Sequence, residues 1–471
     1  MNMMVALLGW VDDRFPLTKL WNEHLAEYYA PKNFNFWYYF GSLALLVLVI
    51  QIVSGIFLTI HYKPDALMAF ASVEYIMRDV PWGWFIRYMH STGASAFFIV
   101  VYLHMFRGLM YGSYRKPREL IWIFGVFIYL ALMAEGFFGY LLPWGQMSYW
   151  GAQVIINLFA AVPFGIGDPL SEWIRGDYVI ADATLNRFFA FHVIAVPLVL
   201  IMLIAAHIIA LHEVGSGNPD GIEIKKHKGS DGIPLDGIPF HPYYTVKDIM
   251  GVVVFLMVFF AVVFFAPTMF GYFIEVPNFE PANGLKTPAH IAPVWYYTPF
   301  YAMLRAVPNM FTSQFPGVIV MGGAIVVLFF LPWIDQSPVK SIRYKDMRTK
   351  LALAAFVISF LILGYFGVVP ASPIKTMVAQ CGTLVYFGYF LYMPYYSRTE
   401  IRATMFRAPL VALYTLVTFV IIWWWWQDER VTVAIRSLMT IFALGYTTYF
   451  LILPAYVKPA VVKPVPERVT K

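Results

Sequence analysis

The chain has 471 residues, of which 60% are hydrophobic and 13% are charged, with a formal net charge of +6. Soluble domains average about 45–50% apolar and about 25% charged residues, so the composition excludes a water-soluble globule and predicts a polytopic membrane protein. Long apolar runs favour an all-α bundle over a β-barrel, whose strands alternate in hydrophobicity. The single cysteine, Cys381, excludes a disulfide framework. The positive charge suits loops that face an anionic leaflet, and no nucleic-acid partner is expected.

The chain begins with MNMMVALLGWVDDRF, whose apolar part is too short for a signal peptide and is interrupted by Asp12 and Asp13. Residues 14–35 predict a short amphipathic helix on the membrane surface. The WWWW string at 423–426 also suits an interfacial aromatic belt, which leaves the last three spans open to a second interpretation. About ten apolar runs have the length of a transmembrane helix: 39–60, 84–106, 121–142, 188–211, 249–269, 316–334, 351–370, 378–396, 408–426 and 434–456.

The basic residues predict the orientation of these spans. The amino-terminal segment, every second loop and the carboxy-terminal tail together hold 23 of the 33 lysines and arginines. By the positive-inside rule this side is cytoplasmic, so both termini are expected there. The longest loops, between the third and fourth and between the fifth and sixth spans, then lie outside, where a partner or substrate would meet the protein.

Two spans each carry two histidines at nearly equal separations. His90 and His104 are fourteen apart, and His192 and His207 are fifteen apart. A helix turns about 100° and rises about 1.5 Å per residue, so either spacing returns the ring to nearly the same face roughly 21 Å further along. Because both spans run from outside to inside, His90 and His192 are expected near the outer face, and His104 and His207 near the inner one.

A single membrane histidine can be a hydrogen-bonded packing residue or part of a proton relay. Four histidines in two matched pairs favour metal binding, and haem is favoured over a bare metal because each depth supplies only two protein ligands. Without a Cys-x-x-Cys-His motif, both haems would be non-covalent and of b type. Two haems at these depths predict a path for electron transfer across most of the membrane.

Small and basic residues repeat the histidine spacing. Arg87 and Arg107 each lie three residues from a histidine, where they can pair with haem propionates or simply reach the interface. Two pairs of glycines, also fourteen apart, would give the haems room, although small residues also serve tight helix packing. These glycines are Gly41 and Gly55 in the first span and Gly125 and Gly139 in the third.

Several strings, in order, carry a family resemblance: GYLLPWGQMSYWGAQVI (139–155), RFFAFH (187–192), HEVGSGNP (212–219), IPFHPYYTVKD (238–248) and PVWYYTPFYAMLRAVPN (293–309). From about residue 14 to 396 the chain resembles cytochrome b of the quinol–cytochrome c oxidoreductases, of a bacterial, proteobacterial-like type. The resemblance implies two b haems and two sites for a ubiquinone-type quinone, one that oxidises quinol outside and one that reduces quinone inside. It also implies a homodimeric complex in a bacterial inner membrane, with a Rieske iron–sulfur protein and a membrane-anchored c-type cytochrome as partners.

Polar residues cluster where the inner site is expected. His212 follows the haem histidine His207 by five residues, Ser216 lies in the loop after it, and Lys247 and Asp248 open the fifth span. A quinone that takes two electrons also takes two protons, which a His/Asp/Lys cluster can relay. The resemblance assigns quinone reduction to these positions; the alternative is an ordinary solvated loop.

The resemblance and the aromatic residues of the two long outer loops together predict the outer quinol site between these loops. Glycine and proline allow a shaped pocket, and aromatic rings suit a flat quinol ring. The candidate residues are Tyr140 and Gly151, with Pro293, Trp295 and Tyr296 of the 293–296 motif and Tyr301 beyond it.

The chain departs from the family at one functional position. The usual motif is Pro-Glu-Trp-Tyr, whose glutamate is taken to receive a quinol proton, but here the position is Val294. Glu135 lies inside an apolar run, where a carboxylate costs free energy unless it has a function or a hydrogen-bonding partner. We therefore hypothesise that Glu135 accepts the quinol proton in place of the missing glutamate. A structural hydrogen bond for Glu135 stays open, and Glu275 and Glu280 are other candidates.

The expected organisation is an amino-terminal surface segment (1–38), a four-helix di-haem core (39–220), carboxy-terminal helices with the quinol-site loop (221–396), and an extra hairpin with a tail (397–471). The hairpin predicts peripheral packing or contact with a supernumerary subunit. Two other functions remain open: a di-haem anchor with one quinone site, and a transporter whose histidines relay protons.

Overall fold

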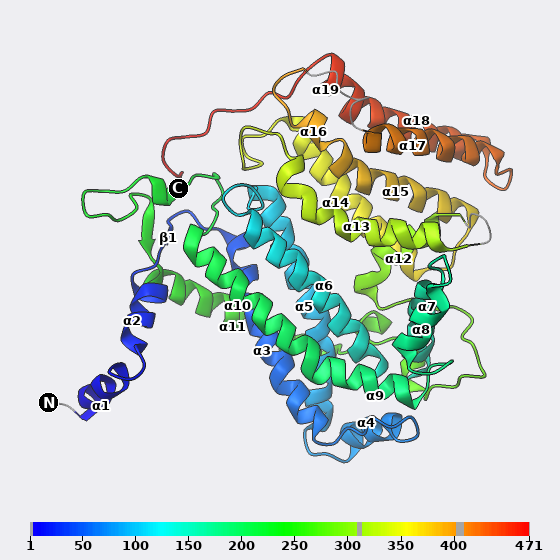
Figure 1. Ribbon diagram of the computed structural model, residues 1–471, viewed down its shortest axis with the longest axis horizontal. Helices are drawn as coiled ribbons and strands as arrows, with labels where there is room; N and C mark the ends of the chain where they lie inside the picture. Colours follow the sequence, from blue (N-terminus) through cyan, green and yellow to red (C-terminus); the bar gives the residue numbers. More distant parts are fainter. Residues whose placement is uncertain (1–2, 309–312, 402–408, 471) are drawn as a thin grey trace.

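The computed structural model describes residues 3–308, 313–401 and 409–470. These residues form a helical bundle with one two-stranded sheet (Figure 1). In lipid, backbone polar groups are satisfied only within helices or closed barrels, so the apolar runs predicted from the sequence are helical. Nine described helices are long and apolar enough to cross a membrane: Phe36–Thr59, Gly83–Tyr111, Glu119–Leu141, Asp182–Val214, Phe240–Phe265, Phe315–Ile334, Met347–Val368, Pro409–Gln427 and Val433–Tyr456.

These spans contain the labelled helices of Figure 1, some joined to short 3₁₀ or π segments. They are α3 (Tyr39–Thr59), α5 (Gly83–Tyr111), α6 (Glu119–Leu141), α9 (Asp182–Ala190) with α10 (Val196–Val214), α11 (Thr245–Phe265), α13 (Phe315–Ile334), α14 (Met347–Val368), α17 (Pro409–Gln427), and α18 (Val433–Thr447) with α19 (Leu453–Tyr456). The remaining helices are α1 (Met3–Asp12), α2 (Leu17–Trp21), α4 (Ala69–Arg78), α7 (Gln146–Ala160), α8 (Gly167–Arg175), α12 (Thr298–Ala306), α15 (Pro373–Leu391) and α16 (Met393–Tyr396).

Nine of the ten predicted spans have a counterpart among these nine helices; the run predicted at 378–396 differs. It corresponds to α15 (Pro373–Leu391), which carries Lys375 and Gln380 and is not among the nine. The helix packs between α14 and the hairpin of α17 and α18. Because neighbouring helices shield it from the surroundings, a lower hydropathy is tolerated there.

Local signals set several helix ends. The Asp346 side chain accepts a hydrogen bond from the Arg348 backbone N–H at 2.8 Å and so caps the start of α14. At the end of α5, Gly112 has φ of 63°, and a Cβ there would lie 2.6 Å from the Lys340 carbonyl oxygen. Only glycine meets both the left-handed backbone and the close approach.

The surface helix predicted at 14–35 is wrong in its second half. Helix α2 and a following π turn end at Ala26, and Tyr29–Pro31 forms strand β1. This strand pairs antiparallel with β2 (Gly237–Pro239), with Ala30 opposite Ile238. The pairing with a segment about two hundred residues away overrides the local helical pattern.

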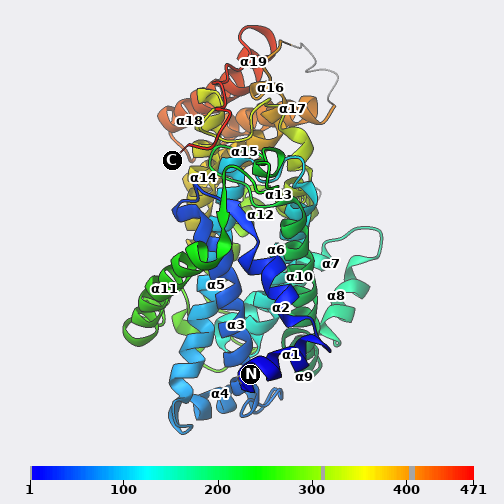
Figure 2. The same ribbon diagram turned by 90° about the vertical axis from the view of Figure 1, so that its left-hand side faces the viewer.

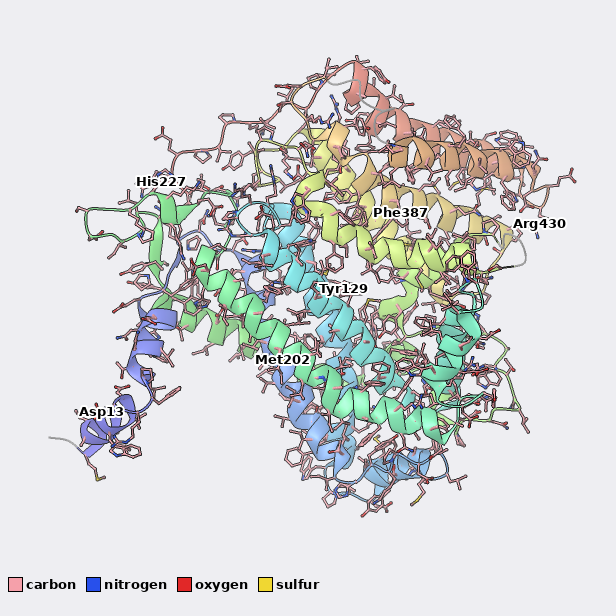
Figure 3. All side chains as sticks on the ribbon, viewed as in Figure 1. Asp13, Tyr129, Met202, His227, Phe387 and Arg430 are labelled. Atoms are coloured by element: carbon pink, nitrogen blue, oxygen red, sulfur yellow. The ribbon has the colours of Figure 1, made fainter. Side chains whose placement is uncertain are left out.

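The four predicted core spans lie together. Helix α3 packs along α5, and α6 packs along α10. Tyr129 of α6 is 1% exposed and lies near the middle of the bundle, whereas Met202 on the outer face of α10 is 63% exposed (Figure 3). The loop that carries His227 lies at the end of the bundle where α10 finishes, opposite α4 and α9 (Figures 1 and 3).

The extra hairpin of α17 and α18 packs on the core through α15. Trp425 Nε1 donates to Gln380 Oε1 at 2.6 Å, and Tyr446 OH donates to the Val385 carbonyl at 3.2 Å. In both views the hairpin lies on the opposite side of the bundle from α4 (Figures 1 and 2). From α19 the tail returns across the molecule, where Arg468 pairs with Asp236 at 2.8 Å. The Arg468 guanidinium, joined by Lys32, holds the pKa of Asp236 well below its usual range despite burial.

Candidate functional site

The four membrane histidines form two facing pairs. The rings of His90 and His192 have centroids 6.0 Å apart, and those of His104 and His207 are 6.4 Å apart. Helices α5 and α10 therefore run in the same direction and present one pair at each depth, as the sequence predicts. Two metal–imidazole bonds of about 2 Å on opposite sides of one ion would separate the ring centroids by roughly this much. The pair spacing thus fits a hexacoordinate haem iron at each depth.

A π turn explains the fifteen-residue spacing in the second histidine span. Phe191–Ala195, which includes His192, is π-helical and joins α9 to α10. A π turn takes up one residue more than an α turn, and such turns occur often at functional sites. Pro197 at the start of α10 cannot donate a backbone hydrogen bond, which favours the irregular turn there. The π turn accommodates the extra residue, so His207 still faces the same way as His192.

Each predicted glycine lies against one of the four histidine rings. A Cβ at Gly41 would lie 3.3 Å from His104 Cε1, and one at Gly55 would lie 3.3 Å from His90 Cε1. On α6, a Cβ at Gly125 would lie 3.5 Å from His207 Cε1, and one at Gly139 would overlap the His192 ring. Helix packing alone would not align all four glycines with the same residue type. The alignment is what a haem cradle requires, because a side chain would fill the space beside each ligand.

The outer histidines are oriented by hydrogen bonds to their Nδ1 atoms. His90 Nδ1 is 2.9 Å from Ser54 Oγ, and His192 Nδ1 is 3.1 Å from the Glu135 carbonyl oxygen. A carbonyl only accepts, so the His192 Nδ1 carries the proton and Nε2 is left to bind a metal. Such partners orient metal-binding histidines and raise their basicity.

Glu135 belongs to this orienting group. Its Oε1 lies 3.0 Å from His192 Nδ1, whereas its Oε2 has no hydrogen-bond partner among the described residues. The contact supports the structural hydrogen bond over the proton-accepting role as the reason for a carboxylate in this apolar helix. Ser54, which has the matching position at His90, was not among the predicted residues because a single serine in an apolar span carries no spacing signal.

A cavity of about 490 Å³ includes the space at the outer histidine pair, because His90 and His192 themselves line it. Its lining comes from the ends of α3, α5, α6 and α10 and from the loop before α12. The predicted Glu135, Tyr140 and Tyr296 line it, as do Arg87 and Val294. The cavity is mostly apolar with a few polar groups, as expected of a site for a flat, largely hydrophobic ring.

Three polar groups converge at one wall of this cavity. Tyr140 OH donates to Glu275 Oε2 at 3.0 Å, Asn278 Nδ2 donates to the same oxygen at 2.9 Å, and Asn278 Nδ2 lies 3.1 Å from Tyr140 OH. Burial raises the pKa of Glu275 to about 7, against the opposing effect of these hydrogen bonds. Asn278 was not predicted because it lies in an irregular loop, where no periodicity points to it.

The other predicted outer-site residues are less close to the cavity. Gly151 adjoins Tyr140, whose Cε1 would be 3.5 Å from a Cβ there. Trp295 Nε1 donates to Ser95 Oγ at 3.0 Å, so Trp295 lies behind a residue that lines the cavity. Pro293 precedes Val294 in the same loop. The Tyr301 ring faces Arg305 at 5.3 Å along α12, and its role at the outer site stays a prediction.

The predicted inner-site residues gather where α10 ends and α11 begins. The His212 ring stacks on Tyr28 at 4.7 Å, and Ser216 Oγ is 3.2 Å from Tyr28 OH. Asp248 accepts hydrogen bonds from Tyr38 OH and Ser42 Oγ, each at 3.4 Å. Lys247 is more distant from this group, since its Nζ lies over the Tyr244 ring at 5.2 Å.

Tyr28 was missed because the sequence placed it in a surface helix rather than beside β1. Arg107, three residues beyond His104, donates from Nη2 to the Gly217 carbonyl at 2.6 Å and from Nη1 to Ser113 Oγ at 3.1 Å. It therefore points toward the loop after α10 at the depth of the inner pair. Asn309, the last residue of the 293–309 motif, lies outside the described residues.

Family comparisons agree with this geometry. A family model described as Cytochrome b/b6/petB matches residues 25–215, and one described as Cytochrome b(C-terminal)/b6/petD matches residues 281–387. The cytochrome b of Allochromatium vinosum is 68% identical over 397 residues, which are 83% of this chain and 95% of that protein. The chain belongs to the cytochrome b family. The cytochrome b of Rickettsia prowazekii is 47% identical over 386 residues, which cover 82% of this chain and 92% of that protein.

A solved structure has the same fold. A chain of a hyperthermophilic respiratory Complex III superposes with a TM-score of 0.75 at 39% identity, covering 82% of this chain and 98% of that chain. Cytochrome b proteins bind two b-type haems and form the catalytic, quinol-oxidising subunit of this oxidoreductase. The family therefore decides against the single-site anchor and the transporter.

Proposed function

We propose that His90 and His192 are the axial ligands of the outer haem and that His104 and His207 are those of the inner haem. The facing of the two ring pairs, at 6.0 and 6.4 Å, is the observation that carries this proposal. Each haem, when bound, supplies a one-electron carrier. The protein holds the rings through Ser54 and Glu135, leaves room through four glycines, and offers Arg87 and Arg107 as cationic partners for propionates.

The two carriers connect two quinone sites in a Q-cycle. Quinol oxidation is assigned to the wall of the outer cavity where Tyr140, Glu275 and Asn278 meet, because the rest of that cavity includes the space at His90 and His192 where a haem would lie. Quinone reduction is assigned to the inner group of His212, Ser216 and Asp248, where proton donors lie close to the inner pair. Lys247, which adjoins Asp248 in sequence, is assigned to proton supply from the cytoplasm.

A reduced-minus-oxidised spectrum tests this function. Quinol added to the oxidised complex is expected to reduce b haem, and an inhibitor of the inner site is expected to increase that reduction. The increase is expected because electrons enter from the outer cavity and can no longer leave through inner quinone. Equal reduction with and without the inhibitor would argue for one quinone site.

Asp248 is expected to be needed for quinone reduction. In Asp248→Asn, reoxidation of the inner haem by quinone should slow by about 10²-fold, because a carboxylate that donates protons to the quinone is lost. The measurement is the reoxidation rate of pre-reduced haem with the outer site blocked. Asp231→Asn, in the exposed part of the 215–239 loop, is the control and should keep the native rate. A native rate in Asp248→Asn would remove this residue from the site.

The partners proposed for the chain follow the composition of complex III: a Rieske iron–sulfur protein and a membrane-anchored c-type cytochrome, in a homodimeric complex that uses a ubiquinone-type quinone. The proposed location is a bacterial inner membrane, with both termini in the cytoplasm. The distribution of lysine and arginine among the loops supports this orientation.

A further inference from the structure

The outer cavity lacks the proton acceptor that its motif usually supplies. Oxidation of quinol releases two protons, yet Val294 has no atom that can accept one. Val294 nevertheless lines the cavity, so a quinol there meets an apolar wall at this position. Another residue of the same cavity must take the proton.

The titratable residues that line the cavity are Tyr62, Arg87, His90, Glu135, Tyr140, His192, Glu275 and Tyr296, of which His90 and His192 are the proposed haem ligands. Arg87 is a cation, and Tyr140 and Tyr296 are phenols that donate rather than accept protons near neutral pH. Glu135 is held by the ring of His192 at 3.0 Å. Glu275 is the one carboxylate among the described lining residues that is not engaged with a histidine.

The surroundings of Glu275 suit a base that takes a proton and passes it on. Tyr140 OH and Asn278 Nδ2 both donate to its Oε2, and so hold the carboxylate in one orientation at the cavity wall. The next residue, Val276, is 74% exposed, so the backbone here is at the protein surface. A proton on Glu275 therefore has a short route to water.

We propose that Glu275, oriented by Tyr140 and Asn278, accepts one proton of the quinol in place of the carboxylate that Val294 lacks. One quinol O–H bond breaks, and its proton forms a new O–H bond on the Glu275 carboxylate. The second hydroxyl proton leaves toward the iron–sulfur partner. The two electrons leave one each to that partner and to the outer haem, the acceptors that complex III supplies. The product is quinone, and Glu275 returns to its ionised form by releasing the proton outside. This inference rests on the proposed outer quinol site.

The protonation behaviour of Glu275 supports this role. A general base works best when its pKa is near the working pH, and burial raises the pKa of Glu275 to about 7. Below that pH the group is already protonated and cannot accept, so the oxidation rate is expected to fall as the pH drops through about 7. The charged and titratable groups that share its surroundings are Tyr62, Arg87, His90, Glu135, Tyr140, His192 and Tyr296.

The test uses the complete complex and follows quinol-driven haem reduction with the inner site inhibited. Glu275→Gln is expected to slow the reaction by about 10²-fold and to abolish the fall of rate near pH 7, with both haem spectra unchanged. Val294→Glu in the Glu275→Gln background is expected to restore much of the rate, because it returns a carboxylate to the cavity. Glu275→Asp is expected to keep a pH-dependent rate, since it retains the carboxylate.

Further variants separate Glu275 from its neighbours. Glu172→Gln, an exposed carboxylate of α8 on the same side of the molecule, should match the native rate and pH profile. A native rate and pH profile in Glu275→Gln, or the same loss in Glu280→Gln, would overturn the proposal. If Glu275→Gln lost its haems, the Asp variant and the double variant would decide. Absence of quinol-driven haem reduction in the native complex would instead contradict the proposed function itself.

Discussion

Replacing His192 by Asn is expected to remove the outer haem while the inner haem stays bound. His192 faces His90 at 6.0 Å, so the substitution would remove one of the two proposed ligands of the outer haem. The inner pair, 6.4 Å apart, keeps both its rings. The purified complex should contain one b haem in place of two by pyridine haemochrome assay, and quinol should no longer reduce the inner haem from the outer side.

His227→Asn is the matched control, because His227 lies in an exposed loop away from both pairs (Figure 3). It should retain two haems and native turnover. A His192→Asn complex that kept both haems would show that the pairing does not hold the iron. A complex that lost both would show that the two sites do not fold independently, and His207→Asn would then be used to compare the inner site.

Replacing Asp335 by Asn is expected to cause a large loss of stability. Asp335 follows α13 and is 4% exposed; Lys345 Nζ lies 2.5 Å from its Oδ2, and Tyr114 OH donates to it at 2.7 Å. Although burial alone would raise it, Lys345 and Arg115 keep the pKa of Asp335 below its usual value. The substitution leaves the buried Lys345 with a hydrogen bond to Tyr114 OH but without a carboxylate partner, and breaking a buried ion pair costs about 3–5 kcal/mol. The expected result is a clearly lower midpoint for thermal loss of haem absorbance.

The sign of this effect with pH follows from the lowered pKa. The Asp335 carboxylate stabilises the fold above the ordinary carboxyl pKa, and this contribution is lost as the pH falls through the depressed value in the folded protein. The double variant Asp335→Leu with Lys345→Met should recover part of the loss, because it removes both charges. Asp428→Asn breaks a solvent-facing pair with Arg430 and should change the midpoint little. A native midpoint in Asp335→Asn would mean that the pair contributes nothing net.

Several parts of the site were predictable because they depend on helix geometry alone. The separations of His90 from His104 and of Gly41 from Gly55 specify shared faces before any packing is known. The structure places the glycines against the rings, as the matched spacing suggests. The fifteen-residue spacing was also predicted to keep both ligands, but the reason, a π turn at His192, depends on a backbone irregularity that hydropathy does not reveal.

Other parts could not be predicted because irregular segments and distant partners determine them. Tyr28 reaches His212 only because β1 pairs with β2 across the sequence. Glu135 and Glu275 were both candidate acceptors, and the sequence offered no means to tell that one faces a histidine and the other a tyrosine. The span at 378–396 corresponds to α15, whose packing between α14 and the hairpin of α17 and α18 depends on contacts that a hydropathy pattern does not contain.

The sequence by itself determined that this is a helical membrane protein with two levels of paired histidines, because lipid imposes hydropathy and a helix has a constant rise and turn. The tertiary structure alone decided that the Glu135 carboxylate contacts His192, that the Glu275 carboxylate accepts hydrogen bonds from Tyr140 and Asn278, and that Tyr28 stacks on His212. Those assignments depend on loops whose conformation is set by long-range contacts, and no local pattern in the chain encodes the distance between two side chains that meet there.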